Sequence, residues 1–289
     1  MGDLPAVEVA VRTTAILGEG PTWDMMFSSL LWVDILSCQV HRYDPYHGRD
    51  AVMDVPQHVG AAKPRSRGGL VLNLRDGIAL YDRDGTAQWL VWWARDGVRG
   101  NDAAVDPSGR LWAGTMRYDE QPGGWLARVE PDGAAKVVLD GLSVSNGIGW
   151  SPDGTRMYHV DSPTRRIDVL DFDPASGEAV NRRPLCAVED TPGVPDGLCV
   201  DADGCVWVAL WDGWAVRRYT PDGRLDREVP LPVARPTSCC FGGDGLSDLY
   251  VTTARKDLDE AALAEQELAG SLLVLPDAGN GVAVPAFPG

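Results

Sequence analysis

Four polar residues occupy equivalent settings along the chain, each just ahead of a short apolar run. They are Glu19 in GEGPTW, Asn101 in GNDAAV, Asn146 in SNGIGW and Asp196 in PDGLCV. Carboxylate and carboxamide oxygens are the ligands that hard divalent cations such as Ca²⁺, Mg²⁺ and Mn²⁺ prefer. Taken singly, each is also an ordinary turn residue. Their recurrence in one setting favours a shared site, if the fold brings them together.

The elements that would position these residues form an internal repeat. A turn rich in Asp, Pro and Gly precedes an apolar stretch with a bulky anchor residue, and the unit recurs every ~40 to 50 residues. This period, divided into several short strands, is typical of a propeller blade with four antiparallel strands. The six anchors are Trp32, Val71, Trp112, Tyr158, Trp207 and Tyr250.

The repeat therefore predicts an all-β, six-bladed β-propeller that forms a single domain over residues 1–289. Residues 270–276 would complete the last blade, residues 7–13 would close the ring, and residues 257–268 would form a short helical insertion. The innermost strand of each blade lines the central channel, and the four polar residues fall at the start of that strand. Burying unpaired polar groups is costly, so their convergence there indicates a site.

Composition limits the partners. The chain has 26 basic and 42 acidic residues, and the resulting net charge of −16 disfavours binding to nucleic acid. No stretch approaches the ~18 apolar residues of a membrane span, and the first residues lack the features of a signal peptide. Six cysteines without zinc-site spacing fit reduced thiols. We expect a cytoplasmic monomer that binds neither nucleic acid nor membranes.

Several segments together resemble the senescence-marker protein, regucalcin and gluconolactonase family, which includes bacterial sugar lactonases. The resemblance rests on GEGPTW, the Arg-x-Asn-Asp segment 99–102, GRLWAGTM, SNGIGWSPDGTRMYHVDS, PDGLCVDADGCVWVALW and TSCCFGGDG. These segments follow the family's order over essentially the whole chain. The resemblance implies a six-bladed propeller that holds one divalent ion, which could be Ca²⁺, Mn²⁺, Mg²⁺, Fe²⁺ or Zn²⁺.

The resemblance also implies roles for individual residues. The implied metal ligands are Glu19, Asn146 and Asp196. The residues implied to bind substrate are Arg99, Asn101, Asp119 and the adjacent Glu120. Where the family usually carries a bulky Phe or Pro in the Arg-x-Asn-Asp segment, this chain has Gly100. We therefore expect a freer loop and a wider pocket at that position.

Together these residues predict a metal-dependent lactonase that converts a sugar lactone to the aldonic acid. The ion would polarise the lactone carbonyl, water would attack it, and Asp196 would act as both ligand and base. Two alternatives remain: a metal-dependent aryl esterase or organophosphatase, and a non-catalytic calcium-binding propeller. The four histidines are scattered and GxSxG is absent, so neither a histidine metal site nor a serine hydrolase is expected.

Overall fold

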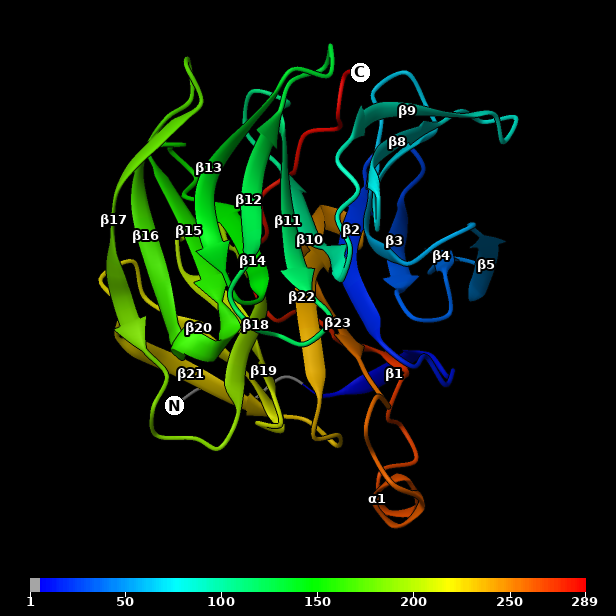
Figure 1. The fold of residues 1–289 in the computed structure, drawn as a ribbon. Coiled ribbons are helices and arrows are strands. Elements are labelled where there is room, and N and C mark those ends of the chain that lie inside the picture. The colour runs from blue at the N-terminus through cyan, green and yellow to red at the C-terminus, as the bar shows by residue number, and fades with distance from the viewer. Residues whose placement is uncertain (1–5) are drawn as a thin grey trace.

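A computed structural model describes residues 6–289, and these residues form a six-bladed β-propeller with almost no helix (Figure 1). Six four-stranded antiparallel sheets surround a central channel, which confirms the architecture that the repeat predicts. All six anchor residues lie in the second strand of their blades. Residues 1–5, part of the segment in which no signal peptide is expected, lie outside the described residues.

The blades are numbered I to VI in chain order, with the innermost strand first. Blade I contains β2 (Gly18–Asp24), β3 (Ser29–Asp34), β4 (Gln39–Asp44) and β5 (Arg49–Asp54). Blade II contains β6 (Val59–Pro64), β7 (Leu70–Leu74), β8 (Gly77–Tyr81) and β9 (Ala87–Trp92). Blade III contains β10 (Val98–Val105), β11 (Leu111–Arg117), β12 (Gly124–Val129) and β13 (Ala135–Leu142). Blade IV contains β14 (Ser145–Trp150), β15 (Arg156–Asp161), β16 (Arg166–Asp173) and β17 (Glu178–Ala187). Blade V contains β18 (Val194–Val200), β19 (Val206–Trp211), β20 (Ala215–Tyr219) and β21 (Leu225–Pro230).

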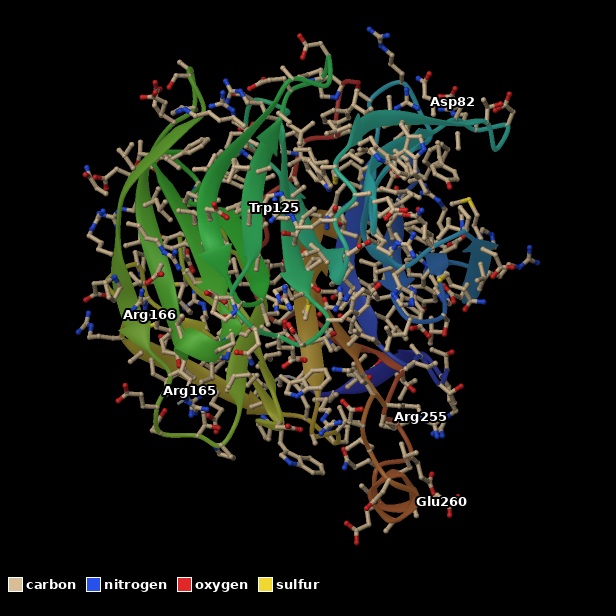
Figure 2. The ribbon with its side chains drawn as sticks, in the orientation of Figure 1. Asp82, Trp125, Arg165, Arg166, Arg255 and Glu260 are labelled. Carbon is tan, nitrogen blue, oxygen red and sulfur yellow. The ribbon has the colours of Figure 1, made fainter. Side chains whose placement is uncertain are left out.

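Blade VI joins the two ends of the chain. It contains β22 (Pro236–Gly242), β23 (Asp248–Thr253) and β24 (Leu272–Leu275), and β1 (Glu8–Val11) pairs antiparallel with β24 as the outer strand. The predicted ring closure is thus confirmed. Helix α1 (Glu260–Glu265) forms within the predicted insertion, and Figure 2 shows Glu260 on it, set apart from the ring. Within residues 6–289, no helix has the length and apolar character needed to cross a membrane.

The repeated turn and its aromatic anchor form one hydrogen-bonded unit. In blade III, Asp106 accepts hydrogen bonds from two amides of its own turn and from Nε1 of Trp112, the last at 3.1 Å. In blade V, Asp201 accepts from Nε1 of Trp207 at 2.9 Å. Both indoles are fully buried, so their N–H groups need an acceptor. The aspartate that shapes the turn supplies it, which explains why turn and tryptophan recur together.

The six innermost strands share an irregularity near their starts. In each, the pairing with the second strand shifts register, as it does at a β-bulge. The shifts lie at Glu19/Thr22, Val59/Ala61, Gly100/Ala103, Asn146/Ile148, Pro195/Leu198 and Pro236/Ser238. A bulge bends its strand and redirects the side chains beside it. The predicted site residues therefore leave the regular ladders at equivalent positions around the channel.

Glycine permits the close approach of neighbouring inner strands. A Cβ atom at Gly60 would lie 2.3 Å from the carbonyl oxygen of Asn101, and one at Gly197 would lie 2.1 Å from Ser238 Oγ. Both distances are far inside van der Waals contact, so a larger residue would force the strands apart. The packing of the channel thus depends on these two positions.

Candidate active site

The four polar residues picked out by the repeat are buried around the channel, and we call Glu19, Asn101, Asn146 and Asp196 the channel ring. Each is between 4% and 6% exposed. Asn101 Nδ2 donates to Asn146 Oδ1 at 2.6 Å, and Asn146 Nδ2 donates to Ser162 Oγ at 2.9 Å. These bonds join blades III and IV at the level of the ring.

Arg99 extends this hydrogen-bonded chain. Its Nη1 donates to Asn101 Oδ1 at 2.7 Å and to the Gly100 carbonyl at 2.8 Å. The predicted substrate residues Arg99 and Asn101 are therefore linked directly to Asn146, a predicted metal ligand. A displacement of any of these three side chains would therefore change the hydrogen bonds of the other two.

Three carboxylates meet at the ring. Burial, followed by the charge of Asp102, raises the pKa of Glu19 from 4.5 to about 8. Burial and the charges of Glu19 and Asp102 raise the pKa of Asp196 well above its ordinary value. Asp196 Oδ1 is buried, and no described residue forms a hydrogen bond with it. The ring thus contains mutually repelling acids and a vacant oxygen acceptor.

This donor set fits a hard divalent cation. Burial and mutual repulsion disfavour the ionised forms of Glu19 and Asp196, and a bound cation would offset both effects. Among the described residues, no group of three His, Cys, Asp or Glu side chains could hold a metal ion. The ring instead offers two carboxylates and the amide oxygen of Asn146, which keeps a second lone pair. An all-oxygen set of this kind suits Ca²⁺, Mg²⁺ or Mn²⁺.

Two aspartates hold the loops that lead into the ring. Asp34, at the end of β3, accepts hydrogen bonds from the successive amides of residues 16 and 17 at 2.9 and 3.0 Å. Asp161, at the end of β15, accepts from the amides of residues 143 and 144 at 3.2 and 2.9 Å. These loops run directly into β2 and β14. Both aspartates therefore position ring residues from one strand away.

The predicted acidic substrate residues lie on the exposed loop after β11. Asp119 pairs with Arg117, Nε to Oδ1 at 2.8 Å, and this hydrogen bond lowers the pKa of Asp119 to about 2. Glu120 Oε1 lies 3.4 Å from Lys256 Nζ, and its charge also acts on Arg99. Glu120 thus interacts electrostatically with the buried Arg99, whereas the Asp119 carboxylate is hydrogen-bonded to Arg117.

The space beside Gly100 is filled, so the expectation of a freer loop and a wider pocket is wrong. A Cβ atom at Gly100 would lie 2.6 Å from both Asn73 Oδ1 and the Leu74 carbonyl oxygen. Asn73 Nδ2 donates to the carbonyls of Asn101 and Gly114, both at 2.9 Å. Gly100 is needed because a side chain of blade II packs against this segment and holds it.

Two charged residues of the site were missed from sequence. Lys63, on the inner strand of blade II, is 6% exposed, and its Nζ donates to Thr22 Oγ1 and to the Gly20 carbonyl. Asp102 is also buried and raises the pKa of Glu19. The available signal was a lysine inside the apolar run VGAAKP, because lysine is almost never fully buried without a partner.

A third missed feature lies nearer the surface. His58 Nδ1 and Tyr118 Oη are 2.7 Å apart, and both side chains lie close enough to Arg99 for its charge to act on them. His58 is one of the scattered histidines, which no sequence pattern singles out. It comes from the loop before β6, and Tyr118 follows β11, so only the folded ring brings them together.

Comparison with known proteins identifies the family of this chain. Residues 17–255 match the family described as SMP-30/Gluconolactonase/LRE-like region. The chain belongs to this family. A family relative, regucalcin of Xenopus laevis, is 35% identical over 98% of both chains. A 6-deoxy-6-sulfogluconolactonase of Pseudomonas putida is 35% identical, covering 98% of this chain and 99% of that protein. The solved structure of a calcium-binding regucalcin from Agrobacterium tumefaciens aligns with a TM-score of 0.94 at 30% identity, covering 98% and 97%.

Proposed function

We propose that this protein hydrolyses a sugar lactone to the aldonic acid, with one divalent ion held by Glu19, Asn146 and Asp196. The observation that carries the proposal is the buried convergence of carboxylates around Asp196 Oδ1, an oxygen without a hydrogen-bond partner among the described residues. Family membership supports the lactone as substrate, since one relative is named 6-deoxy-6-sulfogluconolactonase.

Each residue of the site would have a distinct role in this reaction. A bound divalent ion would supply Lewis acidity, which polarises a lactone carbonyl. Arg99 and Asn101 orient the oxygens of the sugar, and their mutual hydrogen bond fixes both side chains in advance. Asp196 accepts a proton from the attacking water through its unpartnered oxygen. Glu120 and Asp119, on the exposed loop, contact sugar hydroxyls.

A panel of aldonolactones, followed by acid release, tests the proposal. The protein is assayed after chelation and again after addition of Ca²⁺, Mn²⁺, Mg²⁺, Fe²⁺ or Zn²⁺. We expect chelation to abolish turnover and at least one ion to restore it. Asp196→Asn should lower kcat by ~100-fold or more while the fold survives. Asp132→Asn, on an exposed turn of blade III, is the control and should leave turnover unchanged.

A non-catalytic calcium-binding protein is the second candidate, because the solved relative from Agrobacterium tumefaciens is described as calcium-binding. The same assay separates the two. Saturable ion binding without turnover of any lactone in the panel would favour the second candidate. Turnover that persists at full rate after chelation would contradict both.

A further inference from the structure

A cavity of about 360 Å³ lies in the channel behind the ring. Its lining begins just after each ring residue, with Gly20, Asp102, Ile148 and Leu198. None of the four ring residues lines it. The cavity is therefore a separate chamber further along the inner strands, and the function proposed above makes no use of it.

The C-terminal strap, residues 278–289, crosses the far end of this rear cavity. Residues 282–285 line the cavity, and the strap is held on both sides. On one side Gly281 forms a β-bridge with Asp201 of blade V. On the other side Phe287 is fully buried, and its amide donates to the Pro64 carbonyl of blade II at 2.9 Å. The strap, red in Figure 1, thus spans the channel from blade V to blade II.

The lining of the rear cavity is mainly apolar, and apart from Lys63 and Asp102 its polar side chains are uncharged, namely Thr22, Ser151 and Ser238. Its apolar wall includes Ala104, Ile148, Leu198, Val200, Phe241 and Leu246. The charged end carries Lys63 and Asp102, whose opposite charges are close enough to interact. An ammonium group has three donors, and Lys63 uses two of them on Thr22 and Gly20. One donor therefore remains for an occupant, beside a carboxylate acceptor.

We propose that the rear cavity binds a small, uncharged, mainly apolar molecule with one hydroxyl group. An apolar cavity of ~150 Å³ accommodates benzene, so the rear cavity has room for a molecule of two fused rings. A hydroxyl both accepts and donates, so it satisfies Lys63 and Asp102 together. A charged head group would meet a like charge from one of them.

Occupancy would be transmitted to the channel ring. Lys63 Nζ donates to the Gly20 carbonyl at 3.3 Å, and the Gly20 amide donates to Glu19 Oε2 at 3.0 Å. An occupant that accepts a hydrogen bond from the third Lys63 donor draws the ammonium group away from the Gly20 carbonyl, which is already 3.3 Å away, and so loosens the support of Glu19. The rear cavity would then act as an effector site that weakens ion binding. This coupling rests on the proposed function, whereas binding to the cavity does not.

Binding is tested with 2-naphthol, followed by its fluorescence, on metal-free full-length protein. We expect saturable binding of one molecule per chain, and at least ten-fold weaker binding to Ala104→Phe, which fills the cavity. Ala87→Phe, on exposed strand β9, is the matched control and should bind as the wild type does. Absence of saturable binding, or equal loss in both variants, would overturn the proposal.

The polar end is tested separately with Lys63→Met, which keeps the length of the side chain. This variant should lose affinity for 2-naphthol at least five-fold and keep its affinity for naphthalene, which has no hydroxyl. Equal loss for both probes would overturn the role of Lys63. Coupling is tested by repeating the 2-naphthol titration with saturating Ca²⁺, where reciprocity predicts weaker binding. Unchanged affinity would remove the effector role while leaving the binding site in place.

Discussion

Neutralising Glu19 should make the metal-free protein more stable, although it removes a proposed metal ligand. Burial and the nearby Asp102 carboxylate raise the pKa of Glu19 from 4.5 to about 8. The folded protein binds this proton more tightly than the unfolded chain does. The protonated carboxyl therefore favours folding, and its contribution to the free energy of unfolding is complete when the pH is below the pKa of the unfolded chain. That contribution is lost as the pH rises from 4.5 through about 8.

The magnitude follows from the same shift. At pH 7 the unfolded chain has released this proton, whereas most folded molecules retain it. Each pH unit between 4.5 and 7 removes about 1.4 kcal/mol of stability, so the loss at pH 7 is about 3 kcal/mol. Glu19→Gln has no proton to release. Its free energy of unfolding should therefore exceed that of the wild type by up to about 3 kcal/mol at pH 7, and by less than 1 kcal/mol at pH 5.

Urea unfolding of the chelated proteins at pH 5 and pH 7 measures this difference. Glu178→Gln, at an exposed position of β17, is the control and should match the wild type within about 0.5 kcal/mol. Added Ca²⁺ should stabilise the wild type but not Glu19→Gln. A Glu19→Gln protein that is equally stable or less stable at pH 7 without metal would refute this electrostatic reasoning.

Four further predictions concern the support of the ring and the strap. Asp161→Ala leaves two backbone amides without their acceptor and should lower the free energy of unfolding by about 2 kcal/mol in urea. Burial lowers the pKa of His159 from 6.5 to about 3, so only the unfolded chain binds this proton between those values. Stability should then fall with decreasing pH below 6.5 by up to about 1.4 kcal/mol per unit, and His159→Gln should reduce that slope. Gly197→Ala should destabilise the protein by at least ~2 kcal/mol, and Ser238→Gly should restore part of the loss because it removes the two nearest clashing atoms and leaves only the Cα at 2.8 Å. Phe287→Ala should cost about 3 to 5 kcal/mol, measured by thermal or urea unfolding, because its ring is fully buried.

Each of these outcomes has a contrary result. An unchanged midpoint for Asp161→Ala would show that the loop before β14 needs no side-chain acceptor. An unaltered pH slope in His159→Gln would assign the acid sensitivity to other groups. Failure of the double variant to recover would locate the strain of Gly197→Ala elsewhere. A stable Phe287→Ala protein would mean that the strap is not anchored by this residue.

The blade count could be predicted because one local interaction recurs. The aspartate of the repeated turn and the tryptophan of the next strand are six residues apart and hydrogen-bonded, as Asp106 and Trp112 show. Such short-range pairing leaves a readable pattern in the sequence. The equivalent starts of the inner strands follow from it, and Glu19, Asn146 and Asp196 were selected on that ground.

The remaining parts of the site depend on contacts between blades, which no local pattern encodes. Lys63 comes from blade II and meets Gly20 and Thr22 of blade I. The effect of Gly100 was misjudged because Asn73, distant in sequence, fills the space beside it. The register shifts of the inner strands and the path of the C-terminal strap are likewise set by packing across the channel.

The claim that the channel ring holds a divalent ion is tested most directly by crystallography with Mn²⁺. An anomalous difference map from crystals of the full chain would locate the ion without reference to activity. We expect one peak about 2.0 to 2.6 Å from oxygens of Glu19, Asn146 and Asp196. A map without a peak at these three residues, or with the ion bound only elsewhere on the chain, would contradict it.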